Sequence, residues 1–79
     1  MNANGVVLFY TTSSALRAEQ VLLRAKIGIA LIPTPREFSS DCGIACRFPW
    51  VERGRVARLL EKANVEISGI QPLEGSNDG

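Results

Sequence analysis

The order of its hydrophobic patterns is what most constrains how this chain can fold. Four apolar or alternating runs, rich in β-branched and aromatic residues, predict strands at residues 5–10, 29–32, 44–48 and 65–70. Two other runs carry apolar residues at three- and four-residue spacing, which predicts amphipathic helices. One helix starts at the hydroxyl-rich segment 11–14 and lasts about four turns. The other covers residues 52–63. The resulting order is strand, helix, strand, strand, helix, strand.

A chain of 79 residues has room for one domain built in this order. We expect an α+β fold, a ferredoxin-like βαββαβ sandwich with two helices on one face of a four-stranded antiparallel sheet. Right-handed crossovers would place the first and third strands at the centre. The predicted domain covers residues 5–71, between a flexible N-terminus at 1–4 and a disordered polar tail at 72–79.

The sheet face without helices is predicted to be apolar. Strand 5–10, "GVVLFY", is apolar on both of its faces, so one apolar face would be left uncovered. Large exposed apolar patches are unusual on monomers. We therefore expect this open face to form a homo-oligomer or to bind another subunit of a complex.

Composition excludes several classes of function. The chain has no histidine, so the commonest general base and metal ligand are missing. The spacing C-x-x-x-C is a poor match to zinc and thioredoxin motifs, and we expect no metal and no cofactor. A net charge of +1 gives no general attraction to nucleic acid, and runs such as "IGIALIP" are too short to cross a membrane. Two cysteines without a signal peptide suggest a cytoplasmic protein.

Both cysteines lie in the segment "PTPREFSSDCGIACRF", residues 33–48, which begins as a loop after the second strand. In the expected topology this loop lies at the sheet end where the first helix starts, near Thr12 and Ser13. A helix N-terminus offers unpaired N–H groups and a partial positive charge, and both favour a thiolate at Cys42. The alternative is that Cys42 is a small, half-buried residue that fills a tight turn before Gly43.

The neighbouring polar residues of the loop also have more than one interpretation. Arg36 adds a positive charge beside Cys42 if the loop folds back, whereas the carboxylate of Asp41 opposes a thiolate. Ser39 and Ser40 either cap a turn through local hydrogen bonds or line an anion pocket beside Cys42.

Cys46 is expected to have a different role from Cys42, because side chains alternate between the two faces along a strand. Ile44, Cys46 and Phe48 share one face, which predicts that Cys46 is a core residue. Arg47 points to the opposite face, either as a solvated cation or as a contact to an anion or a partner. A Cys42–Cys46 disulfide is not expected, since four strand residues span roughly 13 Å and disulfide Cα separations rarely exceed about 7 Å.

The stretch "VLFYTTSSALRAEQVLLRAKIGIALIPTPREFSSDCGIACRF" resembles the small bacterial and archaeal selenium/sulfur carrier protein-like family. The resemblance runs from about Val6 to Ile70 and includes the hydroxyl-rich helix start and an "AL.AE" pattern. It is most specific in a "P.PR..S..CG" loop with a basic-aromatic ending, at Pro33, Pro35, Arg36, Ser39, Cys42, Gly43 and Arg47. The sequence departs from the family at Cys46, where aliphatic residues are usual, and at Asp41, where small polar residues are common.

The resemblance implies that Cys42 holds sulfur or selenium as a persulfide-type adduct, with a donor or acceptor protein as partner. Such a carrier needs a nucleophilic thiolate, an anion pocket and a docking surface, but no base. We therefore expect a carrier or accessory protein rather than an enzyme. The alternative is a non-catalytic interaction subunit of a larger redox or metabolic complex, in which Cys42 is structural.

Overall fold

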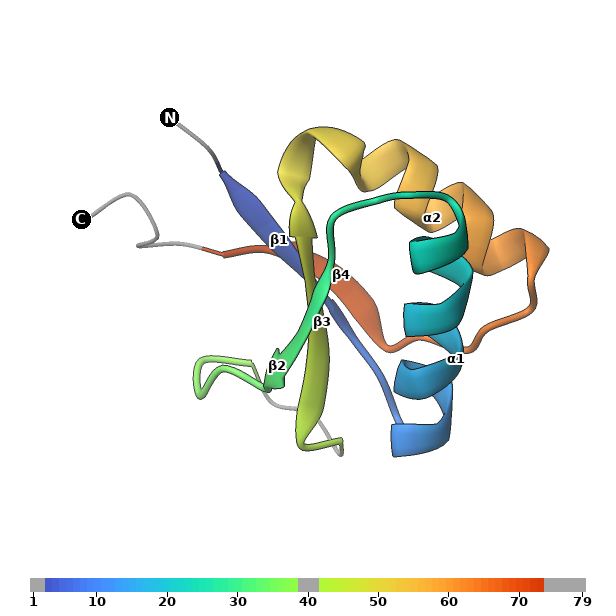
Figure 1. Cartoon of the computed structure of the whole chain (residues 1–79). Helices are drawn as coiled ribbons and strands as arrows, with labels where there is room; N and C mark the ends of the chain where they lie inside the picture. The colour runs from blue at the N-terminus through green and yellow to red at the C-terminus, as the bar shows by residue number, and fades with distance from the viewer. Residues whose placement is uncertain (1–2, 39–41, 74–79) are drawn as a thin grey trace.

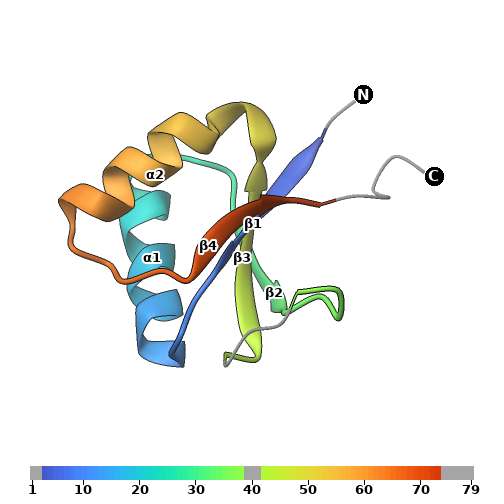
Figure 2. The same cartoon turned by 180° about the vertical axis from the view of Figure 1, so that it is seen from behind.

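The computed structural model describes residues 3–38 and 42–73, and its element order is the predicted one. The elements are β1 (Asn4–Leu8), α1 (Thr12–Arg24), β2 (Ala30–Pro33), β3 (Ile44–Pro49), the 3-10 turn η1 (Trp50–Glu52), α2 (Arg53–Lys62) and β4 (Gly69–Pro72). The strands form an antiparallel sheet in the order β2-β3-β1-β4, with both helices on one face (Figure 1, Figure 2). The predicted ferredoxin-like α+β fold is confirmed, with β1 and β3 at the centre.

The folded part extends slightly beyond the predicted range of 5–71. β1 begins at Asn4 and β4 ends at Pro72. Leu73 also packs against the sheet, although the sequence predicted it as part of a disordered tail. The rest of the predicted flexible N-terminus and tail, apart from Ala3, lies outside the described residues.

Helix α1 begins where the hydroxyl-rich segment predicted. Thr11 is its N-cap, with an extended backbone of φ −138° and ψ 156°. The Oγ1 atom of Thr11 accepts a hydrogen bond from the backbone N–H of Ser14 at 3.2 Å. This bond satisfies one of the four N–H groups that a helix start leaves without partners.

Both helices end in the same backbone motif. Lys26 follows α1 with a left-handed φ of 62°, and Asn64 follows α2 with a φ of 57°. The next N–H then donates to the carbonyl five residues earlier, from Ile27 to Leu22 at 3.1 Å and from Val65 to Leu60 at 2.9 Å. This is the Schellman motif.

Arginine side chains join the two helices at both ends. Arg17 of α1 donates from Nη2 to the carbonyl of Ala63, the C-cap of α2, at 2.9 Å. Arg55 of α2 donates from Nη2 to the carbonyl of Ala25, the C-cap of α1, at 3.1 Å. A cation at a helix C-terminus satisfies a carbonyl and complements the helix dipole. Each helix therefore stabilises the end of the other.

We expect Arg17→Ala and Arg55→Ala each to lower the free energy of unfolding by about 1 kcal/mol, because each removes a charge-assisted hydrogen bond from an exposed helix end. Urea denaturation followed by circular dichroism measures the change. Arg58→Ala, at an exposed position of α2, is the matched control and should change stability by less than about 0.5 kcal/mol. Equal losses in all three variants would show that the two bonds contribute nothing specific.

The main core lies between the sheet and the helices. Its buried residues are Val7, Phe9, Ala15, Ala18, Leu22, Ile27, Cys42, Cys46, Phe48, Val56, Leu60 and Val65. Cys46 and Phe48 point inward along β3, while Arg47 between them is exposed, so the predicted alternation is confirmed.

The last strand begins later than predicted. The alternation of "VEISGI" predicted a strand over 65–70, but β4 is Gly69–Pro72. Val65 donates the Schellman hydrogen bond that ends α2 and is buried, and Ile67 packs against the main core. Both apolar residues therefore belong to the connection between α2 and β4 and not to a strand. Pairing with β1 begins only where Ser68 N–H donates to the carbonyl of Leu8 at 2.6 Å. The residues before it are used in returning from the helix layer to the sheet.

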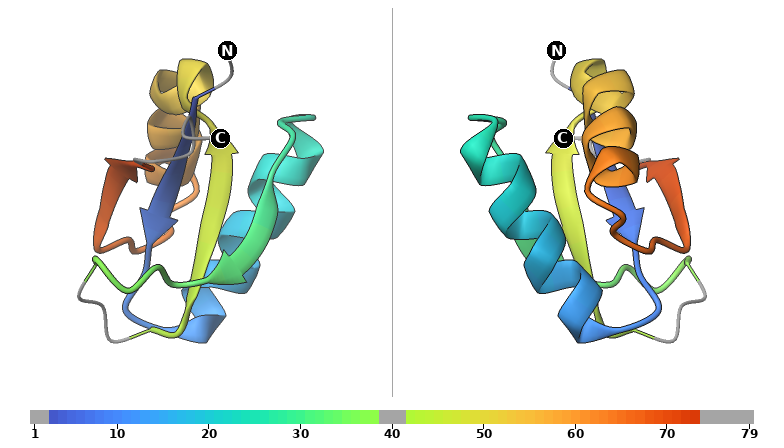
Figure 3. Two further views of the ribbon diagram at one scale, coloured as in Figure 1. Left: turned by 90° about the vertical axis from the view of Figure 1, so that its left-hand side faces the viewer. Right: turned by 90° about the vertical axis from the view of Figure 1, so that its right-hand side faces the viewer.

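The sheet face opposite the helices is covered at its centre. Val6, Leu8 and Ala45 lie on this face and are 0%, 6% and 0% exposed. Ile32, Phe38 and Leu73 pack against them. Phe38 belongs to residues 34–38, here called the strap, which runs from β2 across this face towards β4 (Figure 3). The prediction of a bare apolar face was therefore wrong at the sheet centre. Oligomerisation through this face stays a prediction.

Candidate functional site

Cys42 is held at the start of β3 by hydrogen bonds that close the loop after β2. The Oγ1 atom of Thr34 donates to the carbonyl of Cys42 at 2.8 Å. The backbone N–H of Thr34 donates to the carbonyl of Gly43 at 3.0 Å. Sequence reasoning missed Thr34. The available signal was a residue with two donors between Pro33 and Pro35, neither of which has an N–H to donate.

The side chain of Cys42 lies against the start of α1. Its Sγ atom is 4.0 Å from Oγ1 of Thr12, the first residue of the helix. The topology predicted this juxtaposition of residues thirty positions apart, and the structure brings the two together. Ser13, also predicted here, is exposed in the first turn of α1. A thiol in this place is next to the positive end of the helix dipole.

Cys42 is more buried than either sequence interpretation expected. It is 4% exposed and belongs to the main core. Its neighbours in space and sequence, Thr12 and Gly43, are exposed, so the thiol lies directly beneath the surface. A Cβ atom built on Gly43 would meet nothing within 4 Å, so this position itself has open space around it.

The far end of the strap lies away from the Cys42 side chain, although Thr34 at its start donates to the Cys42 carbonyl. Arg36 is exposed on the strap, and Phe38, two residues later, packs on the sheet face opposite the main core to which Cys42 belongs. The strap instead reaches β4, where Glu37, Phe38, Gln71 and Pro72 line a cleft of about 380 Å³. Ser39, Ser40 and Asp41 lie outside the described residues, so their predicted roles are not addressed by the structure.

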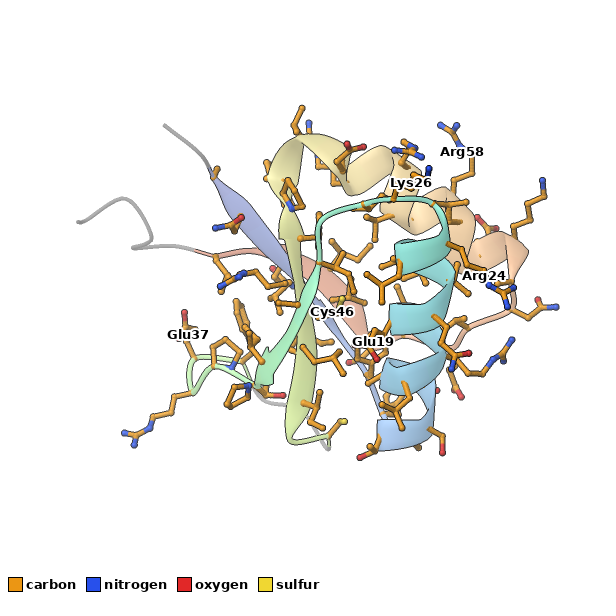
Figure 4. All side chains as sticks on the ribbon, viewed as in Figure 1. Glu19, Arg24, Lys26, Glu37, Cys46 and Arg58 are labelled. Carbon is orange, nitrogen blue, oxygen red and sulfur yellow. The ribbon has the colours of Figure 1, made fainter. Side chains whose placement is uncertain are left out.

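Cys46 is a second thiol with very different surroundings. It is fully buried between β3 and the helices, and Glu19 reaches towards it from α1 (Figure 4). Burial, with a smaller contribution from the negative charge of Glu19, raises the pKa of Cys46 from 9.0 to about 11. The thiol therefore stays protonated and unreactive at neutral pH. Neither cysteine is part of a disulfide.

Comparison with known families gives one result. Residues 4–72 match the family described as "Putative Se/S carrier protein-like". The chain belongs to this family. The matched range contains both cysteines and every element from β1 to β4. No curated protein and no solved structure matches the chain.

Metal sites and membrane spans were also sought in the described residues of this Se/S carrier-like chain. Among residues 3–38 and 42–73, no three cysteine or carboxylate side chains gather as metal ligands would. Within the same part of the chain, neither helix has the length and hydropathy of a membrane span.

Sequence reasoning missed Glu19 as a neighbour of Cys46. Its signal was a carboxylate next to Ala18 on the apolar side of α1.

The buried thiol makes the stability of this family member sensitive to alkali. Because the pKa of Cys46 rises from 9.0 to about 11 on folding, the unfolded chain loses this proton first. The contribution of the Cys46 thiol to the free energy of unfolding is fully present below pH 9. It falls by about 2–3 kcal/mol in total as the pH rises to 11. Urea denaturation of the wild type and of Cys46→Val between these pH values measures it. Stability should fall less steeply in the variant, and parallel slopes would contradict the assignment to Cys46.

Proposed function

We propose that this protein carries sulfur or selenium on Cys42 as a persulfide-type adduct, between a donor and an acceptor protein. Family membership over residues 4–72 supports the class of cargo. The observation that carries the proposal is the position of Cys42 Sγ, 4.0 Å from Thr12 Oγ1 at the first turn of α1. A cytoplasmic location is part of the proposal, since cysteines that form no disulfide are typical of a reducing compartment.

The loading step needs no oxidant and no cofactor. The thiolate of Cys42 attacks the outer sulfur of a donor persulfide, R–S–SH. A new S–S bond forms on Cys42, and the donor S–S bond breaks. The donor leaves as the thiolate R–S⁻ with the bonding electron pair, so the electrons balance. Unloading to an acceptor thiolate is the same exchange in reverse, and a selenium atom takes the place of the outer sulfur without changing the balance.

The surroundings of Cys42 suit an anion with one extra atom. The start of α1 stabilises negative charge on the thiolate before loading and on the persulfide after it. The Thr12 hydroxyl lies within reach of sulfur as a weak hydrogen-bond donor. Gly43, the residue after Cys42, is exposed and adds no side chain at this end of the sheet.

A second candidate is supported by that same low exposure. At 4% exposed, Cys42 also fits the role of a structural residue in an interaction subunit without thiol chemistry. The two candidates differ in one measurable property. A carrier thiol accepts sulfur from a persulfide in the folded state, whereas a structural thiol reacts only after unfolding.

Intact-mass spectrometry of the folded wild type after incubation with glutathione persulfide tests the proposal. We expect a gain of about 32 Da, one sulfur atom, that dithiothreitol removes. Peptide mapping after alkylation should place the added sulfur on Cys42. The absence of a gain under native conditions, with labelling that appears only in urea, would favour the structural role instead.

A further inference from the structure

Charge is divided unevenly between the two layers of the molecule. The helix layer, residues 11–27 and 50–66, contains seven of the nine lysines and arginines but four of the eight acidic residues. Its formal charge is +3, whereas the rest of the chain has a formal charge of −2. The overall charge of +1 therefore conceals a basic helix layer. Such an arrangement orients an approaching charged partner.

The basic residues gather most closely around the C-terminal end of α1. This group, called the basic cluster here, consists of Arg24, Lys26, Arg55 and Arg58. Arg55 reaches α1 through its hydrogen bond to the carbonyl of Ala25, and Arg58 lies one turn further along α2. Figure 4 shows Arg24, Lys26 and Arg58 at this end of the molecule, far from Glu37.

All four members of the basic cluster are available to a partner. Each is exposed. Among the described residues, Arg55 forms an ion pair with Glu52 at 3.4 Å, and Arg24, Lys26 and Arg58 form none. Lys26 is also held in a fixed place by the Schellman motif, so the cluster sits on rigid backbone.

Exposed leucines next to the cluster favour a protein over a nucleic acid as the partner. Leu23, adjacent to Arg24, is 52% exposed, and Leu16, two turns earlier on the same side of α1, is 47% exposed. Apolar side chains flanked by arginine are typical of protein interfaces. Binding to a phosphate backbone gains nothing from leucine and usually accompanies a larger net positive charge.

The other surfaces of the fold are less suited to docking. The edge strands β2 and β4 both end in proline, at Pro33 and Pro72, and proline has no N–H to extend a sheet. The sheet face opposite the helices is filled at its centre by Phe38 and Leu73. The helix layer thus combines the most charge with exposed apolar groups.

We propose that the basic cluster, together with Leu16 and Leu23, is the docking surface for a protein partner whose contacting face is acidic with an apolar centre. α1 is 13 residues long, so the cluster lies about 20 Å along the helix from Thr12. A partner bound there leaves the Cys42 end open to a second protein. The surface applies to a carrier and to an interaction subunit alike, because both need a partner.

Site-specific photo-crosslinking tests this surface. The full chain is expressed in the cells to which it is native, with benzoylphenylalanine replacing Leu23, or replacing Gln71 on the exposed β4 edge as the control probe. Circular dichroism verifies that both probe proteins fold. We expect the Leu23 probe to crosslink to an identified protein, at a peptide lying within an aspartate- and glutamate-rich surface. RNase-sensitive crosslinks to RNA, or no product above the Gln71 probe, would overturn the proposal.

The crosslinked protein is then purified and its affinity for charge-reversal variants is measured. Arg24→Glu and Arg58→Glu should each weaken binding at least tenfold, and the wild-type affinity should fall as salt is raised. Arg47→Glu, which makes the same charge change on the opposite sheet face, should leave the affinity within twofold. Equal losses for Arg24→Glu and Arg47→Glu would show that only net charge matters and would overturn the assignment to this surface.

Discussion

The Cys42→Ser variant is expected to gain no sulfur from glutathione persulfide under conditions in which the wild type is fully loaded. A serine hydroxyl is not ionised at neutral pH and forms no S–S bond, so loading at this position stops completely. Cys46 cannot take over, because it is fully buried and its pKa is raised to about 11. The expected change in intact mass is therefore all or none.

The Cys46→Val variant is the matched control for this experiment. Valine keeps an apolar side chain of similar size in the core, and the folded variant should load like the wild type. Far-ultraviolet circular dichroism of both variants separates loss of chemistry from loss of folding. Loading of Cys42→Ser to the wild-type level, or loss of loading in folded Cys46→Val, would mean that sulfur is held at Cys46 and that the proposed carrier site is misplaced.

Gly5→Ala should be the most destabilising small change in the chain. Gly5 lies on central strand β1, opposite Phe48 of β3. A Cβ atom at this position would lie 2.8 Å from Cζ of Phe48 and 2.8 Å from Cζ3 of Trp50, with Cε3 of Trp50 closer still. Real side chains do not approach so closely, so the rings would have to move.

The rings around Gly5 have little freedom to move. Phe48 and Trp50 are stacked with centroids 6.0 Å apart, and Cζ of Arg53 lies 5.1 Å from the Trp50 ring centroid. Overpacking of this kind costs about 1–3 kcal/mol, and we expect Gly5→Ala to reach about 3 kcal/mol because two rings are displaced together. For a domain of this size the total free energy of unfolding is on the order of 4–10 kcal/mol.

Urea denaturation of Gly5→Ala measures this loss, and two further variants define its cause. Gly54→Ala adds a methyl group in α2 where nothing lies within 4 Å, and should raise stability by up to about 1 kcal/mol through helix propensity. The double variant Gly5→Ala/Trp50→Leu should be more stable than Gly5→Ala, because the clash with the larger ring is removed. A Gly5→Ala midpoint equal to that of the wild type would contradict the close contact.

The alternation along β3 could be predicted from the sequence alone, and so could the approach of Cys42 to Thr12. The former follows from the two-residue repeat of a strand, which decides that Cys46 is inward and Arg47 outward. The latter follows from strand direction, because β2 runs parallel to β1 and so ends at the sheet end where β1 finishes and α1 starts. Both depend on local or topological rules that hold for any sequence with this pattern.

Other features needed the tertiary structure, because they depend on how much space each connection must span. The strand predicted at 65–70 begins four residues later, since the chain must first cross from α2 back to the sheet edge. No sequence rule indicates that Phe38 crosses to the far face of the sheet, while Cys42, four residues later, lies on the helix side. That crossing covers Val6 and Leu8 and separates Arg36 from the thiol.

The sequence by itself determined the element order, the sheet topology and the core position of Cys46. These follow from hydrophobic period and chain connectivity, which are encoded locally. Only the tertiary structure decided how deeply Cys42 is buried and which surfaces remain open. Burial and exposure are set by contacts between residues far apart in the chain, and those contacts exist only once the strap, the helices and the sheet have packed together.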